Sequence, residues 1–110
     1  MMVVSDTSPI ANLAVVGQLD LLRQLYQQVV IPPAVYAEIK RIGADHPVVR
    51  AIETAAWITT QPAVNQTAVA SLRLELDEGE AEAIALALEL PAELLLLGER
   101  KGRMIAAAWA

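Results

Sequence analysis

The sequence contains no cysteine and no phenylalanine, and His46 is its single histidine. Without cysteine there is no disulfide framework and no thiolate metal site, and a reducing, cytoplasmic location is the expectation. No apolar run approaches the roughly 20 residues that a membrane-spanning helix needs, so no membrane partner is expected. The N-terminus has no basic start and carries an early acid, Asp6, which is not the pattern of a signal peptide.

Positive charge is also scarce, since 8 Lys and Arg residues face 13 Asp and Glu residues and the net charge is −5. Modules that bind nucleic acid by bulk electrostatics are usually basic, so this composition counts against that class. It does not exclude an enzyme that gathers carboxylates around a divalent cation, because the metal reverses the local charge.

What the chain does contain is an apolar fraction of 55%, made mainly of Ala, Leu, Val and Ile, in 110 residues. This composition predicts one domain in which helices pack on a buried parallel sheet. Short apolar runs predict strands over residues 2–5, 29–31, 57–60 and 94–97. Helical patterns lie between them, over residues 9–16, 19–26, 34–41, 48–55, 64–75 and 80–90, and one more begins near residue 101. The alternation predicts an α/β fold with a short, mainly parallel sheet of about four strands.

The segment over residues 3–9 ends an apolar, β-branched run with Asp6, followed by two hydroxyl residues and a proline. It predicts a buried strand followed at once by a helix, with Thr7 or Ser8 as its cap and Pro9 at its first position. Ligands are held at the carboxyl ends of parallel strands, so Asp6 is either a helix cap or a functional carboxylate. A phosphotransfer enzyme with a nucleophilic aspartate is disfavoured, because the second acid it would need two residues on is replaced by Ser8.

Three acids, Asp6, Glu38 and Glu80, stand at the predicted starts of helices. In a parallel sheet, the carboxyl ends of the strands and the starts of the helices that follow them lie at the same edge. Residues 98–99, which follow the fourth predicted strand, are expected at this edge as well. Carboxylates gathered there repel each other unless a cation joins them. Hard oxygen ligands suit Mg²⁺ or Mn²⁺, and such ions support phosphodiester hydrolysis.

Each of these features also has a plainer interpretation. Acids in the first turn of a helix are expected from the helix dipole alone, and the run over residues 77–80 can be a solvated capping turn. His46 is best read as a surface cap beside a proline. The basic cluster after the fourth strand either steers a phosphate backbone or forms a solvated helix face; its members are Arg100, Lys101 and Arg103.

Four segments together resemble a known family. They are VVSDTSPI at residues 3–10, IPPAVYAEI at 31–39, LDEGEAEAIALA at 76–87 and LLLLGERKGR at 94–103. In this order they cover nearly the whole chain, and they are similar to PIN domains. Within that family the resemblance is to the poorly characterised prokaryotic branch related to VapC toxins.

The resemblance implies a three-layer α/β/α fold and a Mg²⁺- or Mn²⁺-dependent endoribonuclease. It further implies the toxin of a toxin–antitoxin pair, with RNA as substrate, a protein antitoxin as partner and a homodimeric state. By position, the catalytic and metal-binding acids would be Asp6, Glu38 and Glu80. The hydroxyl near the metal or phosphate would be Ser8, and a further neighbour of the site would be Glu82.

The chain departs from the family pattern in two ways. The family has an aspartate directly after the fourth strand, where this chain has Gly98; Glu99 follows, but a shift of one residue points its side chain elsewhere. The family also continues with another strand and helix, so residues 1–110 are expected to form a single, C-terminally short PIN-like domain. The alternative function is therefore a degenerate domain that is catalytically inactive and binds a partner protein.

Overall fold

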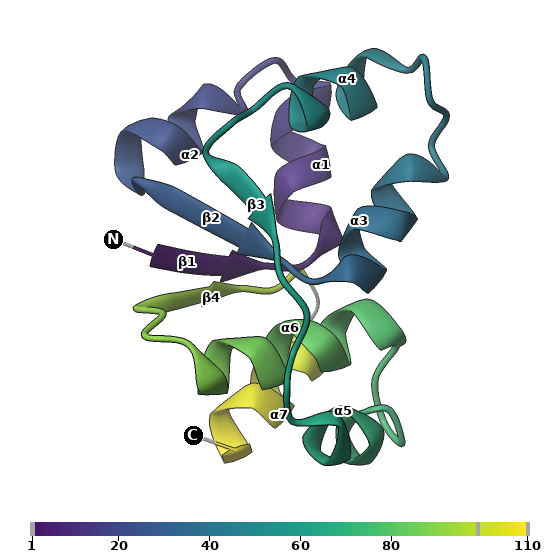
Figure 1. Cartoon of the computed structure of the whole chain (residues 1–110), viewed down its shortest axis with the longest axis vertical. Helices are drawn as coiled ribbons and strands as arrows, with labels where there is room; N and C mark the ends of the chain where they lie inside the picture. Colours follow the sequence, from purple (N-terminus) through teal and green to yellow (C-terminus); the bar gives the residue numbers. More distant parts are fainter. Residues whose placement is uncertain (1, 99, 110) are drawn as a thin grey trace.

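The computed structural model of the chain describes residues 2–98 and 100–109, and the side chains of residues 2–98 and 102–107. Four strands alternate with seven helices in these residues (Figure 1). The strands are β1 (Met2–Ser5), β2 (Gln28–Ile31), β3 (Ile58–Thr60) and β4 (Leu94–Leu96). The helices are α1 (Thr7–Val15), α2 (Asp20–Leu25), α3 (Pro33–Lys40), α4 (Pro47–Glu53), α5 (Gln66–Leu72), α6 (Glu78–Glu89) and α7 (Arg100–Trp109). None of these described helices is long and apolar enough to cross a membrane.

The four strands form one sheet in the order β3-β2-β1-β4, and every neighbouring pair is parallel. The first strand therefore lies in the interior of the sheet, with Val3 opposite both Val29 of β2 and Leu94 of β4. Parallel neighbours require crossover connections, and the helices between the strands supply them. The predicted parallel α/β arrangement is confirmed.

Helices cover both faces of this sheet (Figure 1). Because strand side chains alternate between faces, Val4 and Val30 join the core beneath α5 and α6. Val29 and Ile31 join the second core, beneath α1, α3 and α4. The architecture is thus the three-layer α/β/α sandwich that the resemblance implies.

The first helix begins earlier than the sequence predicts, and of the candidate caps Asp6, Thr7 and Ser8 it is Asp6 that caps it. Asp6 has extended backbone angles and its carboxylate accepts a hydrogen bond from the amide of Ser8 at 3.2 Å. The cap is therefore Asp6 and not Thr7 or Ser8, and Pro9 is the third residue of α1. A short carboxylate one residue after a strand reaches the free amides of the first turn as well as a hydroxyl does.

Two other helix boundaries agree with the signals in the sequence, and the bounds of one helix differ from the prediction. Gly17, with φ of +72°, follows α1 as a left-handed C-terminal residue. His46 caps α4, with its Nδ1 accepting a hydrogen bond from the Val48 amide at 3.2 Å, so it is the surface cap that was expected. The helix predicted over residues 64–75 is shorter, because Asn65 caps α5 through the amide of Ala68 and the helix ends at Leu72.

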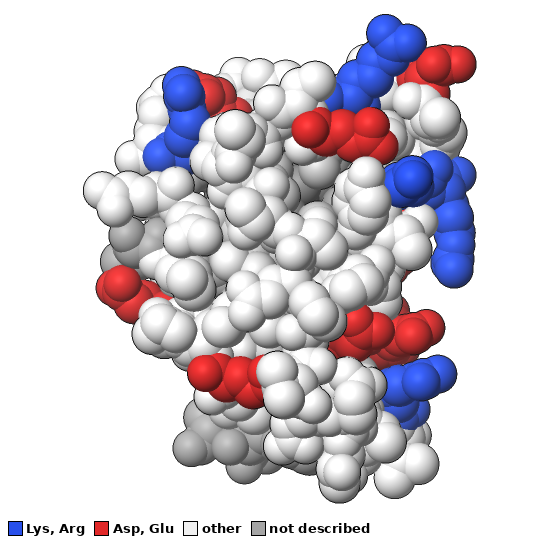
Figure 2. Space-filling model, viewed as in Figure 1, with Lys and Arg blue, Asp and Glu red and all other residues white. Residues whose placement is uncertain are grey.

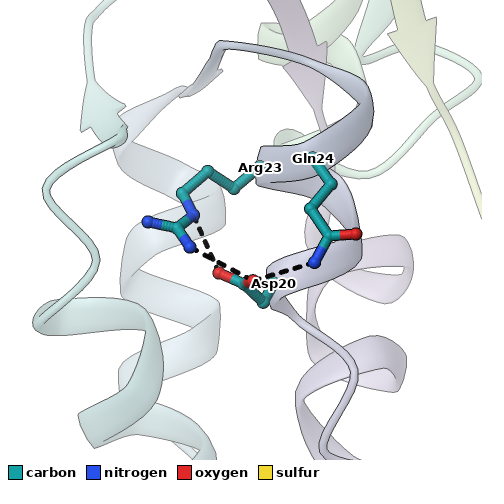
Figure 3. A network of polar contacts seen from close by, with 3 residues as sticks. All are labelled: Asp20, Arg23 and Gln24. Atoms are coloured by element: carbon teal, nitrogen blue, oxygen red, sulfur yellow. Dashed lines mark hydrogen bonds and ion pairs between the residues drawn. The ribbon is translucent and has the colours of Figure 1, made fainter.

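The exposed helix α2 carries a small polar network (Figure 3). The carboxylate of Asp20 accepts hydrogen bonds from Arg23 and Gln24, each at 3.2 Å, and also forms an ion pair with Arg23. Since α2 leads into the amino end of β2, this network lies at the opposite edge of the sheet from Asp6 (Figure 1). It provides a matched surface aspartate for comparison with the site.

Helix α3 gives a direct test of the core. Ile39 is fully buried, whereas Ile42, just beyond the helix, is 43% exposed. Ile39→Ala is expected to lower the free energy of unfolding by about 3 kcal/mol, because it removes apolar burial and leaves a cavity. Ile42→Ala should cost less than about 1 kcal/mol. Denaturant unfolding followed by circular dichroism measures both, and equal losses would contradict the described packing of α3.

Candidate functional site

A small cavity of about 40 Å³ lies at the carboxyl end of β1. It has room for a few water-sized ligands. Four of its seven lining residues are acids, and the lining comprises Asp6, Thr7, Ser8, Glu38, Asp77, Gly79 and Glu80. The three acids singled out in the sequence therefore do share one edge of the sheet. Their catalytic and metal-binding roles remain predictions.

Asp6 is held at the point where β1, β4 and α1 meet. Its backbone amide donates to the carbonyl of Leu96 at 3.0 Å, which continues the pairing of β1 with β4. Its carboxylate accepts hydrogen bonds from the backbone amides of Ser8 and Gly98. The side chain is only 5% exposed, so the position of this carboxylate is fixed by backbone groups on two sides.

The electrostatic environment of Asp6 is unfavourable to its own charge. Burial raises the pKa of the carboxyl group, and the hydrogen bonds from Gly98 and Ser8 offset part of that effect. The nearby charges of Asp77 and Glu38 raise the pKa of Asp6 further. Like charges around one small cavity create a negative potential, which a bound cation would relieve.

Glu38 reaches the cavity from a different position than the sequence predicts. It is the sixth of the eight residues of α3 and is not near the helix start, because the helix begins at Pro33. The helix dipole therefore does not account for an acid here. Its Oε2 accepts a hydrogen bond from the Thr7 hydroxyl at 3.0 Å, which links α1 to α3 across the cavity. Thr7 was not identified as a site residue from the sequence.

Asp77 belongs to the acidic run over residues 77–80, for which the sequence left two interpretations open, part of the acidic edge or a solvated capping turn. It does cap α6, with its Oδ1 accepting from the Glu80 amide at 2.8 Å. It also lines the cavity, and its charge acts on Asp6. The signal that could have found it is its parallel with Asp6, since each is an N-cap acid at the carboxyl edge of the sheet.

Glu80 lies deeper than the other acids of the α6 start and is 6% exposed. Its carboxylate faces the first turn of α7, where a Cβ added to Gly102 would overlap Glu80 Oε2. The absence of a side chain at Gly102 therefore leaves the space that the Glu80 carboxylate occupies. Glu80 connects the wall of the cavity to helix α7.

Glu82 does not line the cavity. It lies in an adjacent groove of about 480 Å³ between α3 and the start of α6, which Arg41 also lines. Its carboxylate accepts from the Ala34 amide at 3.4 Å. Burial raises the pKa of Glu82, and among the neighbouring charges Glu78 raises that pKa while Arg73 lowers it. Figure 2 shows carboxylates gathered on this flank, with basic side chains above and below them.

The remaining residues singled out in the sequence have three different outcomes. Ser8 is exposed and lines the cavity, and its role toward a ligand remains a prediction. Arg103 donates to the carbonyl of Leu97 at 3.1 Å, so it ties α7 to the end of β4. Residue Glu99 and the side chains of Arg100 and Lys101 lie outside the described residues, so their assigned roles remain predictions.

The donor set of the cavity suits a hard divalent cation. Carboxylate oxygens are the ligands that Mg²⁺ and Mn²⁺ prefer. Among the residues whose side chains are described, no group of three or more acids, histidines or cysteines is arranged so as to hold an ion. Mg²⁺ usually keeps several waters and takes one or two carboxylates together with substrate phosphates. The cavity fits that mode of binding and not a closed protein cage.

Comparison with known proteins identifies a family. A family model described as a PIN domain matches residues 2–110. No curated protein and no solved structure matches the chain.

The raised pKa of Asp6 predicts how metal-free protein responds to pH. The ionised carboxylate lowers stability at neutral pH, and the stability present below the ordinary carboxyl pKa is lost as pH rises through the raised pKa. Asp6→Asn should therefore raise the unfolding temperature at pH 7 in EDTA, and the difference from wild type should close near pH 3.

Asp20→Asn is the control for this experiment and has the opposite sign. Hydrogen bonds from Gln24 and Arg23 lower the pKa of Asp20. Its replacement should therefore lose a little stability at pH 7 and nothing at low pH. An Asp6→Asn protein that is less stable than wild type at pH 7 would contradict the electrostatic description of the cavity.

Proposed function

Because the chain belongs to the PIN domain family, a family of nuclease-type domains, we propose that it is a divalent-metal-dependent endoribonuclease. The reaction would be hydrolysis of phosphodiester bonds in RNA. The observation that carries the proposal is the carboxylate-lined cavity at the end of β1. An acidic chain with a net charge of −5 needs a cation to bring a phosphate to such a site.

The residues that would hold Mg²⁺ or Mn²⁺ directly are one or two of the four acids that line the cavity. Asp6 is the central candidate, because the charges of Glu38 and Asp77 act on it and it is almost fully buried. Glu80 would complete the acidic wall. Such an ion, when bound, supplies Lewis-acid stabilisation of the phosphate and lowers the pKa of bound water.

The chain's own groups prepare the cavity for this chemistry. The amides of Ser8 and Gly98 fix the Asp6 carboxylate, so little reorganisation is needed when a ligand arrives. Thr7 restrains the long side chain of Glu38 through its hydroxyl. The proposal assigns to the Ser8 hydroxyl a hydrogen bond to a phosphate oxygen. Contacts with the RNA backbone are assigned to Arg100 and Lys101.

The biological role belongs to the same proposal. The resemblance to VapC-like proteins supports a toxin that pairs with a protein antitoxin and forms a homodimer. The alternative is a domain without catalysis that binds a partner protein. Gly98, which offers an amide donor where the family pattern has an acid, favours this alternative.

The first test compares Asp6→Asn with Asp20→Asn in Mn²⁺-dependent cleavage of a mixed pool of single-stranded RNA. We expect Asp6→Asn to lose cleavage by roughly 100-fold or more and to lose Mn²⁺ binding, since loss of a supporting shell residue alone can cost that much. The remote Asp20→Asn should stay within about twofold of wild type. Cleavage that survives in Asp6→Asn contradicts the assignment. No cleavage by the wild type moves the weight to the partner-binding alternative.

The second test separates capping from metal binding at Asp77. Asparagine caps helices about as well as aspartate, so Asp77→Asn should unfold within about 0.5 kcal/mol of wild type. Its Mn²⁺ affinity should fall by roughly 10-fold because one carboxylate of the cavity is lost. Glu78→Gln, at an exposed neighbour that does not line the cavity, should keep the wild-type affinity. If Asp77→Asn binds Mn²⁺ as tightly as wild type, Asp77 caps α6 and does not contribute to metal binding.

A further inference from the structure

Gly98 lies in unusually close contact with the first turn of α1. A Cβ built on Gly98 would be 2.6 Å from Ser8 Cβ, 3.0 Å from Ser8 Oγ and 3.7 Å from Pro9 Cδ. Side-chain carbons essentially never approach each other as closely as the first of these distances. Among the described glycines, positive φ is found at Gly17 and Gly43 and not at Gly98. The restriction at Gly98 is therefore one of space and not of backbone conformation.

The close approach has a chemical result. It brings the Gly98 amide within hydrogen-bonding reach of the Asp6 carboxylate, which the Ser8 amide also contacts. The Asp6 amide in turn binds the Leu96 carbonyl. The end of β4, the end of β1 and the first turn of α1 are thus joined at one carboxylate.

We propose that Gly98 is a positioning residue for Asp6, and that its lack of a side chain is what lets its amide hold the carboxylate in the cavity. The consequence for a metal is that any side chain at residue 98 forces the turn after β4 away from Ser8. An acid placed there would then disturb Asp6 before it could serve as a ligand. The part of this inference that concerns metal rests on the proposed function.

The variants Gly98→Ala and Gly98→Asp separate this proposal from the view that the site lacks an acid. If an acid is missing, Gly98→Asp should bind Mn²⁺ more tightly than wild type and cleave RNA faster. If Gly98 positions Asp6, both variants should bind Mn²⁺ roughly 10-fold more weakly, as expected for disturbed support of a ligand. Both should also unfold at a lower temperature than wild type.

Ser8 provides the matched control, because the contact is with its Cβ. Ser8→Gly removes that carbon and Ser8→Ala keeps it, while both remove the hydroxyl. In a double-mutant cycle, each double variant is compared with its own Ser8 single variant. Gly98→Ala should lose little unfolding temperature in the Ser8→Gly background and its full amount in the Ser8→Ala background. Equal losses in the two backgrounds would overturn the steric argument.

Hydrogen exchange of the backbone amide at residue 98 reads the hydrogen bond to Asp6 without metal or RNA. The wild-type amide should be protected, and Gly98→Ala should exchange at least 10-fold faster than wild type, with protection recovering in the Ser8→Gly background. A protection that Gly98→Ala leaves unchanged would refute the positioning role. If wild-type protein neither binds Mn²⁺ nor cleaves RNA, the proposed function fails. The hydrogen-exchange measurement and the double-mutant cycle on unfolding temperature still decide whether Gly98 positions Asp6.

Discussion

The site depends on one buried carboxylate that is held by backbone amides. Asp6 leaves the interior strand β1 directly, caps α1 and accepts from both Ser8 and Gly98. Burial of a charge is costly unless hydrogen bonds compensate it, and here the compensation comes from two different parts of the chain. These hydrogen bonds offset the cost of burying the Asp6 carboxylate, and they also fix its orientation toward the cavity. Structure and candidate chemistry are therefore set by the same contacts.

The acids around Asp6 add a conflict that the fold accepts. Asp77 and Glu38 raise the pKa of Asp6, although each also has a structural partner, in the Glu80 amide and in the Thr7 hydroxyl. A protein selected for stability alone would have little reason to place four carboxylates around about 40 Å³. The hydrogen bonds to Asp6, Glu38 and Asp77 stabilise the structure around the cavity, although the four carboxylates keep its potential negative. Such locally unfavourable arrangements are typical of functional sites.

The sequence was sufficient for the alternation of strands and helices, the parallel sheet and the shared edge of Asp6, Glu38 and Glu80, because these follow from apolar periodicity and strand order. The sequence was not sufficient where one local pattern is compatible with two structural roles. The acid–hydroxyl run of residues 6–8 did not reveal which side chain caps α1, and the run over residues 77–80 left Asp77 open to two interpretations, an acid of the site or a residue of a capping turn. The contact of Gly98 with Ser8 has no local signal at all, since it depends on how β4 aligns with β1.

The place of β1 inside the sheet also determines when the site forms during synthesis. The strand that precedes Asp6 is synthesised before the other three strands, yet its neighbour β4 comes from residues 94–96. While residues 94–98 are still inside the ribosome, a nascent chain can pair β1 with β2. It still lacks the contacts that Leu96 and Gly98 make with Asp6. Non-local parallel pairing is slow compared with local helix formation. The cavity therefore cannot be complete before residues 94–98 have been synthesised, and a chain that stops short of them carries its acids without the contacts that align Asp6.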